Sequence, residues 1–170
     1  MKNQIKNKII EDFYENDYFS YESDCNLLGD KKISLLIDFG YDSNRTKMLN
    51  KHINKINEIL KWIDEHKKDV SDFIIYKQCL TLAEEWVLTY EKIDDNSYKN
   101  QVGEIINIPI KEEEFFNSMY IDTLLIDFDE DEIRPDTTIH ILFKPDYFKG
   151  HSLIVYVDGD KNIEYGDIVV

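Results

Sequence analysis

The amino-acid sequence predicts an α+β domain in which an antiparallel sheet carries a two-helix hairpin packed on one face. Three observations lead to this prediction. An apolar segment early in the chain has the length and composition of a strand. Apolar residues then recur at helical spacing over two long segments, and four segments in the last third alternate between apolar and polar residues. Helices gathered on one face of an antiparallel sheet are typical of this class.

The first 40 residues contain two segments that we expect to be extended. Residues 5–10 are compatible with a helical turn, and Phe13–Glu22 is an aromatic-rich segment with strand character. A turn at Gly29-Asp30 precedes Lys32–Phe39, whose sequence KISLLIDF is mostly apolar. A nearly continuous apolar strand of this kind is typically covered on both faces.

Two helical patterns follow Gly40. The first begins at Ser43 or Asn44, either of which can cap a helix, and the second begins at Asp69 or Ser71. The connection around residues 66–69 is short, which predicts an antiparallel helical hairpin. The apolar positions are Leu49, Ile53, Ile56, Leu60 and Ile63 in the first helix, and Phe73, Tyr76, Leu80, Ala83, Val87 and Tyr90 in the second.

The remainder of the chain predicts one short helix and most of the sheet. Asp94–Gly103 is polar and is expected to be a loop, and Lys111–Ser118 is expected to be a short helix. The turn Asp158-Gly159-Asp160 is a strong signal for a hairpin. The four strand candidates are Tyr120–Phe128, Thr137–Lys144, His151–Asp158 and Ile163–Val170.

Length and charge limit the classes of function. A chain of 170 residues fits one domain, spanning residues 1–170, and its formal net charge is -15. This acidic balance argues against nucleic-acid binding, which needs clustered lysines and arginines. No apolar run approaches the roughly 18 residues that cross a membrane. The two cysteines, Cys25 and Cys79, lie far apart, which favours free thiols in a reducing cytoplasm.

The sequence carries no motif for a nucleophile, a phosphate loop or a dinucleotide, so it predicts no catalytic residue and no cofactor. Asp127, Asp129 and Asp131 begin like a calcium loop. However, Glu132 and Thr138 stand where that loop needs glycine and glutamate. We therefore predict a solvated turn at this position and no metal ligand.

Two histidines, His140 and His151, lie on or beside consecutive strand candidates near Asp146. Two neighbouring imidazoles with a carboxylate could hold a metal ion or act in acid–base chemistry. The alternation of Ile139 and Ile141 places His140 on the opposite face of its strand, and no third ligand is evident. A solvated or hydrogen-bonded histidine is the favoured interpretation.

The residues that we expect to contact a protein partner combine tyrosines with carboxylates, as adaptable interfaces do. The alternative for the N-terminal aromatics is that they pack on the sheet as an edge strand. The predicted partner-binding residues are Tyr14, Asp17, Tyr18, Tyr21, Asp129, Glu130, Asp131, Glu132, Tyr147 and His151.

Several segments together resemble a known family. They are KISLLIDF, Glu85-Trp86 in the helical region, EEEFFNSMYIDTLLIDF, and the stretch Asp146–Ser152 with its Phe-x-Gly-His-Ser sequence. From about Asp12 to Val170 the chain is similar to a bacterial family of uncharacterised proteins, the domain of unknown function 2262. Lys149 stands where the resemblance leads us to expect an aromatic residue. The resemblance implies a small bacterial domain and no established activity, so it assigns no catalytic residue.

Three hypotheses for function follow. The first is an acidic cytoplasmic protein-binding module with a basic partner, such as an immunity-type protein that neutralises a basic toxin. The second is a divalent-cation-binding domain or metal-dependent enzyme that uses the acidic turns with His140 or His151. The third is a subunit or adaptor whose outer sheet strand pairs with another chain. We favour the first; the oligomeric state is left open.

Overall fold

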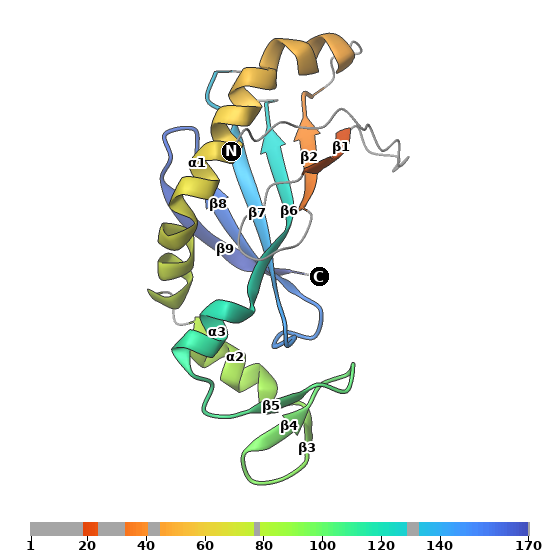
Figure 1. The fold of residues 1–170 in the computed structure, drawn as a ribbon, viewed down its shortest axis with the longest axis vertical. Coiled ribbons are helices and arrows are strands. Elements are labelled where there is room, and N and C mark those ends of the chain that lie inside the picture. The colour runs from red at the N-terminus through yellow and green to blue at the C-terminus, as the bar shows by residue number, and fades with distance from the viewer. Residues whose placement is uncertain (1–18, 24–32, 41–44, 77–78, 129–132, 170) are drawn as a thin grey trace.

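The fold is a mixed α/β arrangement. Its structure is a computed structural model that describes residues 19–23, 33–40, 45–76, 79–128 and 133–169. Within these ranges the chain forms three helices and two sheets, and most strand pairs are antiparallel. The predicted α+β class is therefore confirmed. Figure 1 shows the larger sheet with α1 along one side, and the smaller sheet below it.

The larger sheet has six strands in the order β1-β2-β6-β7-β8-β9. Neighbouring strands pair antiparallel except β2 and β6, which run parallel because a long connection through the helices separates them. All four strand candidates of the last third are confirmed, as is the early apolar strand. The strands are β1 Phe19–Ser23, β2 Ile33–Asp38, β6 Met119–Asp127, β7 Asp136–Phe143, β8 Ser152–Val157 and β9 Ile163–Val169.

A row of four buried side chains crosses the middle of this sheet. The register aligns Leu35 with Leu124, Leu124 with Ile139, and Ile139 with Val155. All four are fully buried and belong to one apolar cluster with Ile56, Ile59, Leu60 and Ile63 of the first helix. Burying a side chain of this size stabilises the fold by roughly 1.5–3 kcal/mol. The row and the helix above it therefore fix which face of the sheet is the core.

The first helix, α1 (Arg45–Tyr76), runs through residues 66–69, so the predicted hairpin connection there is wrong. The helix has a kink instead, where His66 has φ -112° and ψ 15°. The His66 ring stacks on Trp62, and its Nδ1 donates to the Trp62 carbonyl at 2.8 Å. A side chain that bonds the carbonyl one turn back competes with the helical ladder, which accounts for the kink.

The sequence pattern explains why the helix continues. Residues 66–69 contain neither glycine nor proline, and the buried stripe resumes at Val70 and Ile74. The chain then enters α2 (Cys79–Val87), which buries Cys79, Ala83 and Val87. The structure thus replaces a two-helix hairpin by one kinked helix followed by a short one.

The smaller sheet was not predicted. It consists of β3 (Glu91–Lys92), β4 (Ser97–Lys99) and β5 (Ile105–Asn107) in that order, and β4 lies inside the segment expected to be a loop. Its strands are two or three residues long, too short to show a period. Tyr98 and Ile106 are paired in the register and are both buried. The short helix α3 (Glu112–Ser118), which was predicted, then leads into β6.

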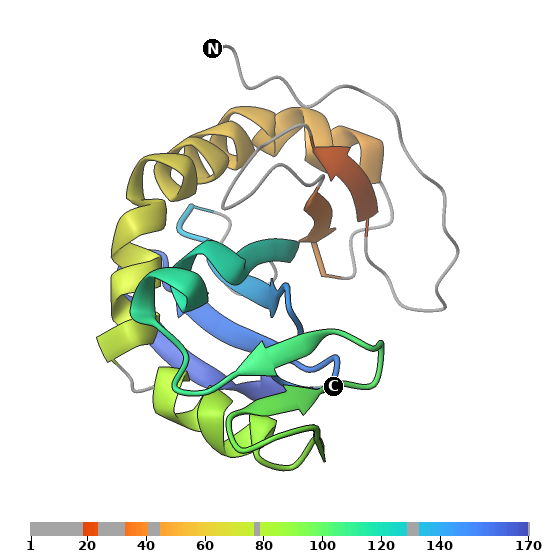
Figure 2. The ribbon, with the colours of Figure 1, turned by 60° about the horizontal axis from the view of Figure 1, so that its bottom comes forward.

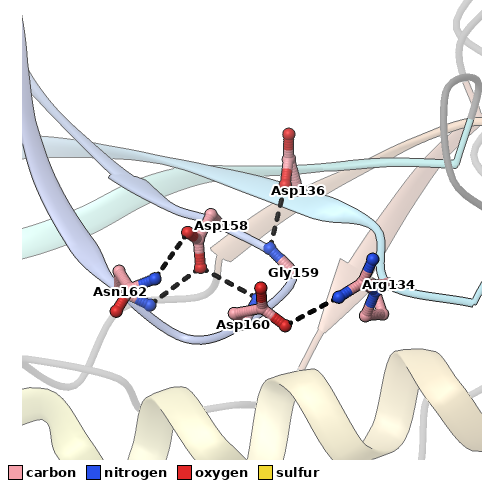
Figure 3. Close-up of polar contacts among 6 residues, drawn as sticks. All are labelled: Arg134, Asp136, Asp158, Gly159, Asp160 and Asn162. Atoms are coloured by element: carbon pink, nitrogen blue, oxygen red, sulfur yellow. Dashed lines mark hydrogen bonds and ion pairs between the residues drawn. The ribbon is translucent and has the colours of Figure 1, made fainter.

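The hairpin turn between β8 and β9 is confirmed at residues 158–162. The Asp158 carboxylate accepts the N–H groups of Asp160 and Asn162 at 2.9 and 2.8 Å, and the Asn162 side chain at 2.7 Å (Figure 3). Gly159 donates its N–H to Asp136 at 2.9 Å, and Arg134 pairs with Asp160 at 3.0 Å. The turn is thereby fastened to the start of β7.

We predict that Gly159→Ala destabilises the protein. A Cβ at this position would lie 2.3 Å from the Arg134 carbonyl oxygen and 2.6 Å from the Arg134 Cβ, so one backbone must move. Overpacking of this kind lowers the free energy of unfolding by about 1–3 kcal/mol. Urea denaturation measures the change. Asp160→Ala is the control, because it removes only an exposed ion pair and should have a small effect. Equal midpoints for Gly159→Ala and the wild type would contradict the close approach.

Candidate functional site

The polar residues of the larger sheet concentrate at its two ends. At one end the register places Asp38, Asp127 and Asp136 side by side on β2, β6 and β7, and the β8–β9 turn lies next to them. We call these residues, with Asp158 and Asp160, the acidic end. At the other end lies the turn 144–151 between β7 and β8, which we call the docking turn. Figure 1 shows this turn facing the smaller sheet.

The carboxylates of the acidic end bind mainly to the chain itself. Asp38 accepts the Gly40 N–H at 2.8 Å, and Asp136 accepts that of Gly159. Hydrogen bonds from the side chain and backbone of Asn162 hold the pKa of Asp158 below its usual value. Among the residues that the structure describes, no three His, Cys, Asp or Glu side chains are placed to hold a metal ion. The predicted partner-binding residues Asp129, Glu130, Asp131 and Glu132 lie outside the described residues.

The docking turn is held by a tyrosine of the helical region. The Tyr90 hydroxyl donates to the Asp146 carbonyl at 3.1 Å and accepts the Lys149 N–H at 2.9 Å. Burial raises the pKa of Tyr90 to about 12, so the hydroxyl is protonated and remains a donor at neutral pH. The Lys149 ammonium lies 5.6 Å from the centre of the Tyr90 ring.

A second set of bonds joins the smaller sheet to the same turn. Glu104, just before β5, accepts the Asp146 N–H at 3.2 Å and the Asn100 side-chain amide at 2.8 Å. Asn100 is buried and its side-chain carbonyl oxygen accepts the N–H groups of Val102 and Glu104. The side chains of Asn100 and Glu104 thus link the segment before β5 to the docking turn, and their hydrogen bonds are made to each other and to the neighbouring backbone. We call this set of bonds, with those of Tyr90, the junction.

Two predicted partner-binding residues, Tyr147 and His151, fall on the docking turn. Tyr147 is only 3% exposed, and its ring packs on Phe115 and Phe143 with centroids 5.6 and 5.9 Å away. Its ring contributes to the core, and burial raises the pKa of its hydroxyl. His151 is half-buried; its Nδ1 donates to the Lys149 carbonyl at 3.3 Å, and its ring meets Trp86 edge-on at 5.1 Å.

The structure does not describe the side chains of the predicted N-terminal residues. Tyr14, Asp17 and Tyr18 lie outside the described residues, and Tyr21 lies in β1, for which only the backbone is described. The two histidines considered as a pair are not cross-strand partners. The register pairs His140 with Ile154, and the His140 Nδ1 lies 3.1 Å from the Ser152 hydroxyl. Burial lowers the pKa of His140.

A hollow of about 450 Å³ opens between the docking turn, α3 and the smaller sheet. It lies within the range of roughly 300–1,000 Å³ that is typical of ligand pockets. Its lining combines apolar and polar side chains, one of which is the predicted residue Tyr147. The sequence did not reveal the hollow, because it predicted a loop and no smaller sheet in this region, and β5 of that sheet contributes to the lining. The lining residues are Ile105, Ile106, Asn107, Ile110, Glu114, Asn117, Ser118, Lys144, Pro145 and Tyr147.

The residues of α3 that line the hollow, Glu114, Asn117 and Ser118, are all polar. Lys144 donates its backbone N–H to the Ser118 carbonyl at 2.8 Å, which fastens the docking turn to the end of α3. On the same helix, a hydrogen bond from Lys111 at 2.8 Å holds the pKa of Glu114 below its usual value, so this carboxylate is charged at neutral pH. This arrangement can bind a segment that offers hydrogen bonds and positive charge.

We predict that Tyr90→Phe loosens the smaller sheet. The substitution keeps the ring but leaves the Asp146 carbonyl and the Lys149 N–H without their shared partner. Loss of such buried bonds lowers the free energy of unfolding by about 1–3 kcal/mol. Tyr156→Phe is the matched control, because Tyr156 is exposed. Equal stability of the two variants in denaturant melts would contradict the role assigned to the hydroxyl.

We predict that His140 makes the protein less stable in mild acid. Because burial lowers its pKa from 6.5, the unfolded chain takes up a proton first as the pH falls. The stability linked to this group is full above the unfolded pKa and is lost as the pH falls below it. His140→Gln should therefore lose less stability than the wild type between roughly pH 7.5 and 5.5. Parallel stability curves for the two proteins would contradict this.

No helix in the described part of the chain has the length and apolar character needed to span a membrane. No curated protein and no solved structure matches this chain. One family model does match, over residues 9–168, and its description is "Uncharacterized protein conserved in bacteria (DUF2262)". The matched range includes the three helices and the docking turn of the described residues, and both sheets apart from Val169 at the end of β9. The chain therefore belongs to this family of uncharacterised bacterial proteins, as its sequence segments indicated.

Proposed function

We propose that this protein is a protein-binding module of the bacterial cytoplasm and that its partner is basic. The observation that carries the proposal is the uneven distribution of charge along the fold. Residues 79–170 contain 21 of the 35 acidic residues but only 7 of the 20 basic ones. Residues 45–76, which form α1, contain 7 basic and 5 acidic residues. The excess of acidic over basic residues thus lies in the part of the sequence after α1.

The acidic residues of α1 differ from those of α3 in their neighbours. On α1, carboxylates lie within 4 Å of lysines one turn away, as in Lys55–Glu58 and Lys61–Glu65. On α3 three glutamates follow one another at the N-terminus; Lys111 pairs with Glu114, and Glu112 and Glu113 are exposed. A surface with excess charge of one sign speeds association with an oppositely charged protein by roughly 10- to 1,000-fold at low salt.

The more specific form of the proposal is an immunity-type role, in which the acidic surface covers the basic active surface of a toxin. Its support is the same charge distribution, together with a hollow that offers binding groups and no reactive centre. Electrostatic complementarity of this kind gives rapid association and selects against acidic partners.

The direct test uses the products of the genes adjacent to this one. We expect one of them to be a basic protein that co-purifies with this chain at low salt and dissociates as the salt concentration rises. If that product is toxic on its own, co-expression of this chain should restore growth. The proposal fails if no adjacent product binds and no basic protein is recovered at any salt concentration.

Charge substitutions test the mechanism of association. The double variant Glu112→Gln with Glu113→Gln removes two exposed charges from α3 and should reduce the association rate constant several-fold while changing dissociation little. The matched control is Glu58→Gln with Glu65→Gln, which removes two charges from α1 next to lysines. Stopped-flow or surface-plasmon measurements give both rates. Equal association rate constants for the two double variants would contradict electrostatic steering by the glutamates of α3.

A further inference from the structure

β5 is the outermost strand of the smaller sheet, and no strand among the described residues pairs with its outer edge. The order β3-β4-β5 leaves β5 paired on one side only. Ile108 donates its N–H to the Asn96 carbonyl at 2.9 Å, and Asn100 donates its N–H to the Glu104 carbonyl at 3.0 Å. Since antiparallel partners alternate along a strand, residues 104, 106 and 108 face β4. The backbone groups of Ile105 and Asn107 therefore point to the opposite edge.

This open edge borders the hollow. Ile105, Ile106 and Asn107 belong to its lining, together with residues of α3 and with Lys144 and Pro145 of the docking turn. Figure 2 shows β5 as the strand of the smaller sheet that lies nearest α3. An unpaired edge with space beside it is the arrangement into which an extended segment of another chain can add a strand.

The side chains at the edge match the requirements of such a segment. Ile105 is 61% exposed, unusual for a large apolar residue in a strand, and can cover an apolar side chain of an incoming strand. Tyr147, Ile110 and Pro145 contribute apolar groups to the lining of the hollow.

The charges along α3 indicate which segment fits. Glu114 lines the hollow, and Glu112 and Glu113, which directly precede it, are exposed. Lys144 is the one basic residue in the lining. Because successive side chains of a strand point to opposite sides, a segment that alternates apolar residues with lysine or arginine would place its apolar groups against the apolar lining residues and its charges toward the glutamates of α3.

We propose that β5 accepts an extended, lysine- or arginine-containing segment of the partner protein as a fourth strand of the smaller sheet. The inference rests on the protein-binding function proposed above and adds its mode. The backbone of Ile105 and Asn107 supplies the hydrogen bonds, and the hollow receives alternate side chains. The bonds of Asp146 to Tyr90 and Glu104 fasten the docking turn, which contributes to the lining of the hollow, to the segment that carries the smaller sheet.

The test selects binders from a phage-displayed library of random linear peptides, with the full chain as the target. We expect the selected peptides to alternate apolar and basic residues, and to slow hydrogen exchange at the amides of Ile105 and Asn107 when NMR follows it. Selection of no peptide, or protection confined to α1 or to β9, would overturn the proposal.

Three variants identify the edge. Asn107→Pro removes one outward N–H, and Ile105→Lys places a positive charge beside a basic segment. Each should weaken binding of a selected peptide about tenfold or more, a change of about 1.4 kcal/mol. Val102→Lys is the matched control: it adds the same charge at a residue 74% exposed on the same unit, just before β5, and should bind as the wild type does. Ile105→Lys replaces an exposed side chain, so it reports on binding even if Asn107→Pro fails to fold.

The two proposals can fail separately. If the basic partner binds the Ile105→Lys and Asn107→Pro variants normally but dissociates in salt, the strand proposal is wrong and the protein-binding function stands. If the peptides protect Ile105 and Asn107 but no basic protein binds, the function proposed for the chain is wrong and the edge remains a binding site. If light scattering shows a dimer that Ile105→Lys dissociates, the occupant is a second copy and the strand proposal is overturned.

Discussion

The attachment of the smaller sheet to the docking turn is the interaction on which the functional part of this structure depends. Tyr90 bridges Asp146 and Lys149, and Glu104 binds the Asp146 N–H from the opposite side. These bonds join residues that are 42 to 59 positions apart in the sequence. The strands of the smaller sheet span only two or three residues each, so these bonds add to the burial of Tyr98 and Ile106 in holding it in place. The turn fastened in this way supplies Lys144, Pro145 and Tyr147 to the lining of the hollow.

The junction also gives a physical meaning to the segment by which the family was recognised. In the stretch Asp146–Ser152, Phe148 is fully buried, Asp146 and Lys149 bind Tyr90, and His151 packs on Trp86. Gly150 has φ 82°, in the region that favours glycine. The residues by which the family was recognised therefore hold the docking turn in place. The groups proposed to contact a partner lie beside this turn, on β5 and α3.

Sequence reasoning succeeded where periodicity is strong. The alternation of Ile139 and Ile141 predicted β7 and its buried face, and Asp158-Gly159-Asp160 predicted the last hairpin. It failed at residues 66–69, which were interpreted as a short connection between two helical patterns. The structure shows a kink, which the His66 side chain causes through its bond to Trp62. Such a bond leaves no periodic trace in the sequence.

The candidate site was predictable only in part, for two physical reasons. Tyr147 was selected as a surface aromatic, but the helix α3 that covers it comes from a segment 29 or more residues earlier, and period alone does not reveal such packing. The open edge of β5 depends on a strand of three residues, Ile105–Asn107, which is below the length at which alternation can be recognised. The net negative charge, in contrast, follows directly from composition. The excess of acidic residues in 79–170 can be counted in the sequence, and the fold shows which helices and strands this range forms.

In the proposed mode of binding, the excess negative charge of residues 79–170 attracts a basic protein, and the edge of β5 beside the hollow holds it. The most direct measurement is amide hydrogen exchange across the whole chain, with and without the basic product of an adjacent gene. We expect slower exchange in residues 105–107, in α3 and in the docking turn, with α1 unchanged. Protection confined to α1, or no change anywhere while the two proteins remain bound, would contradict this mode of binding.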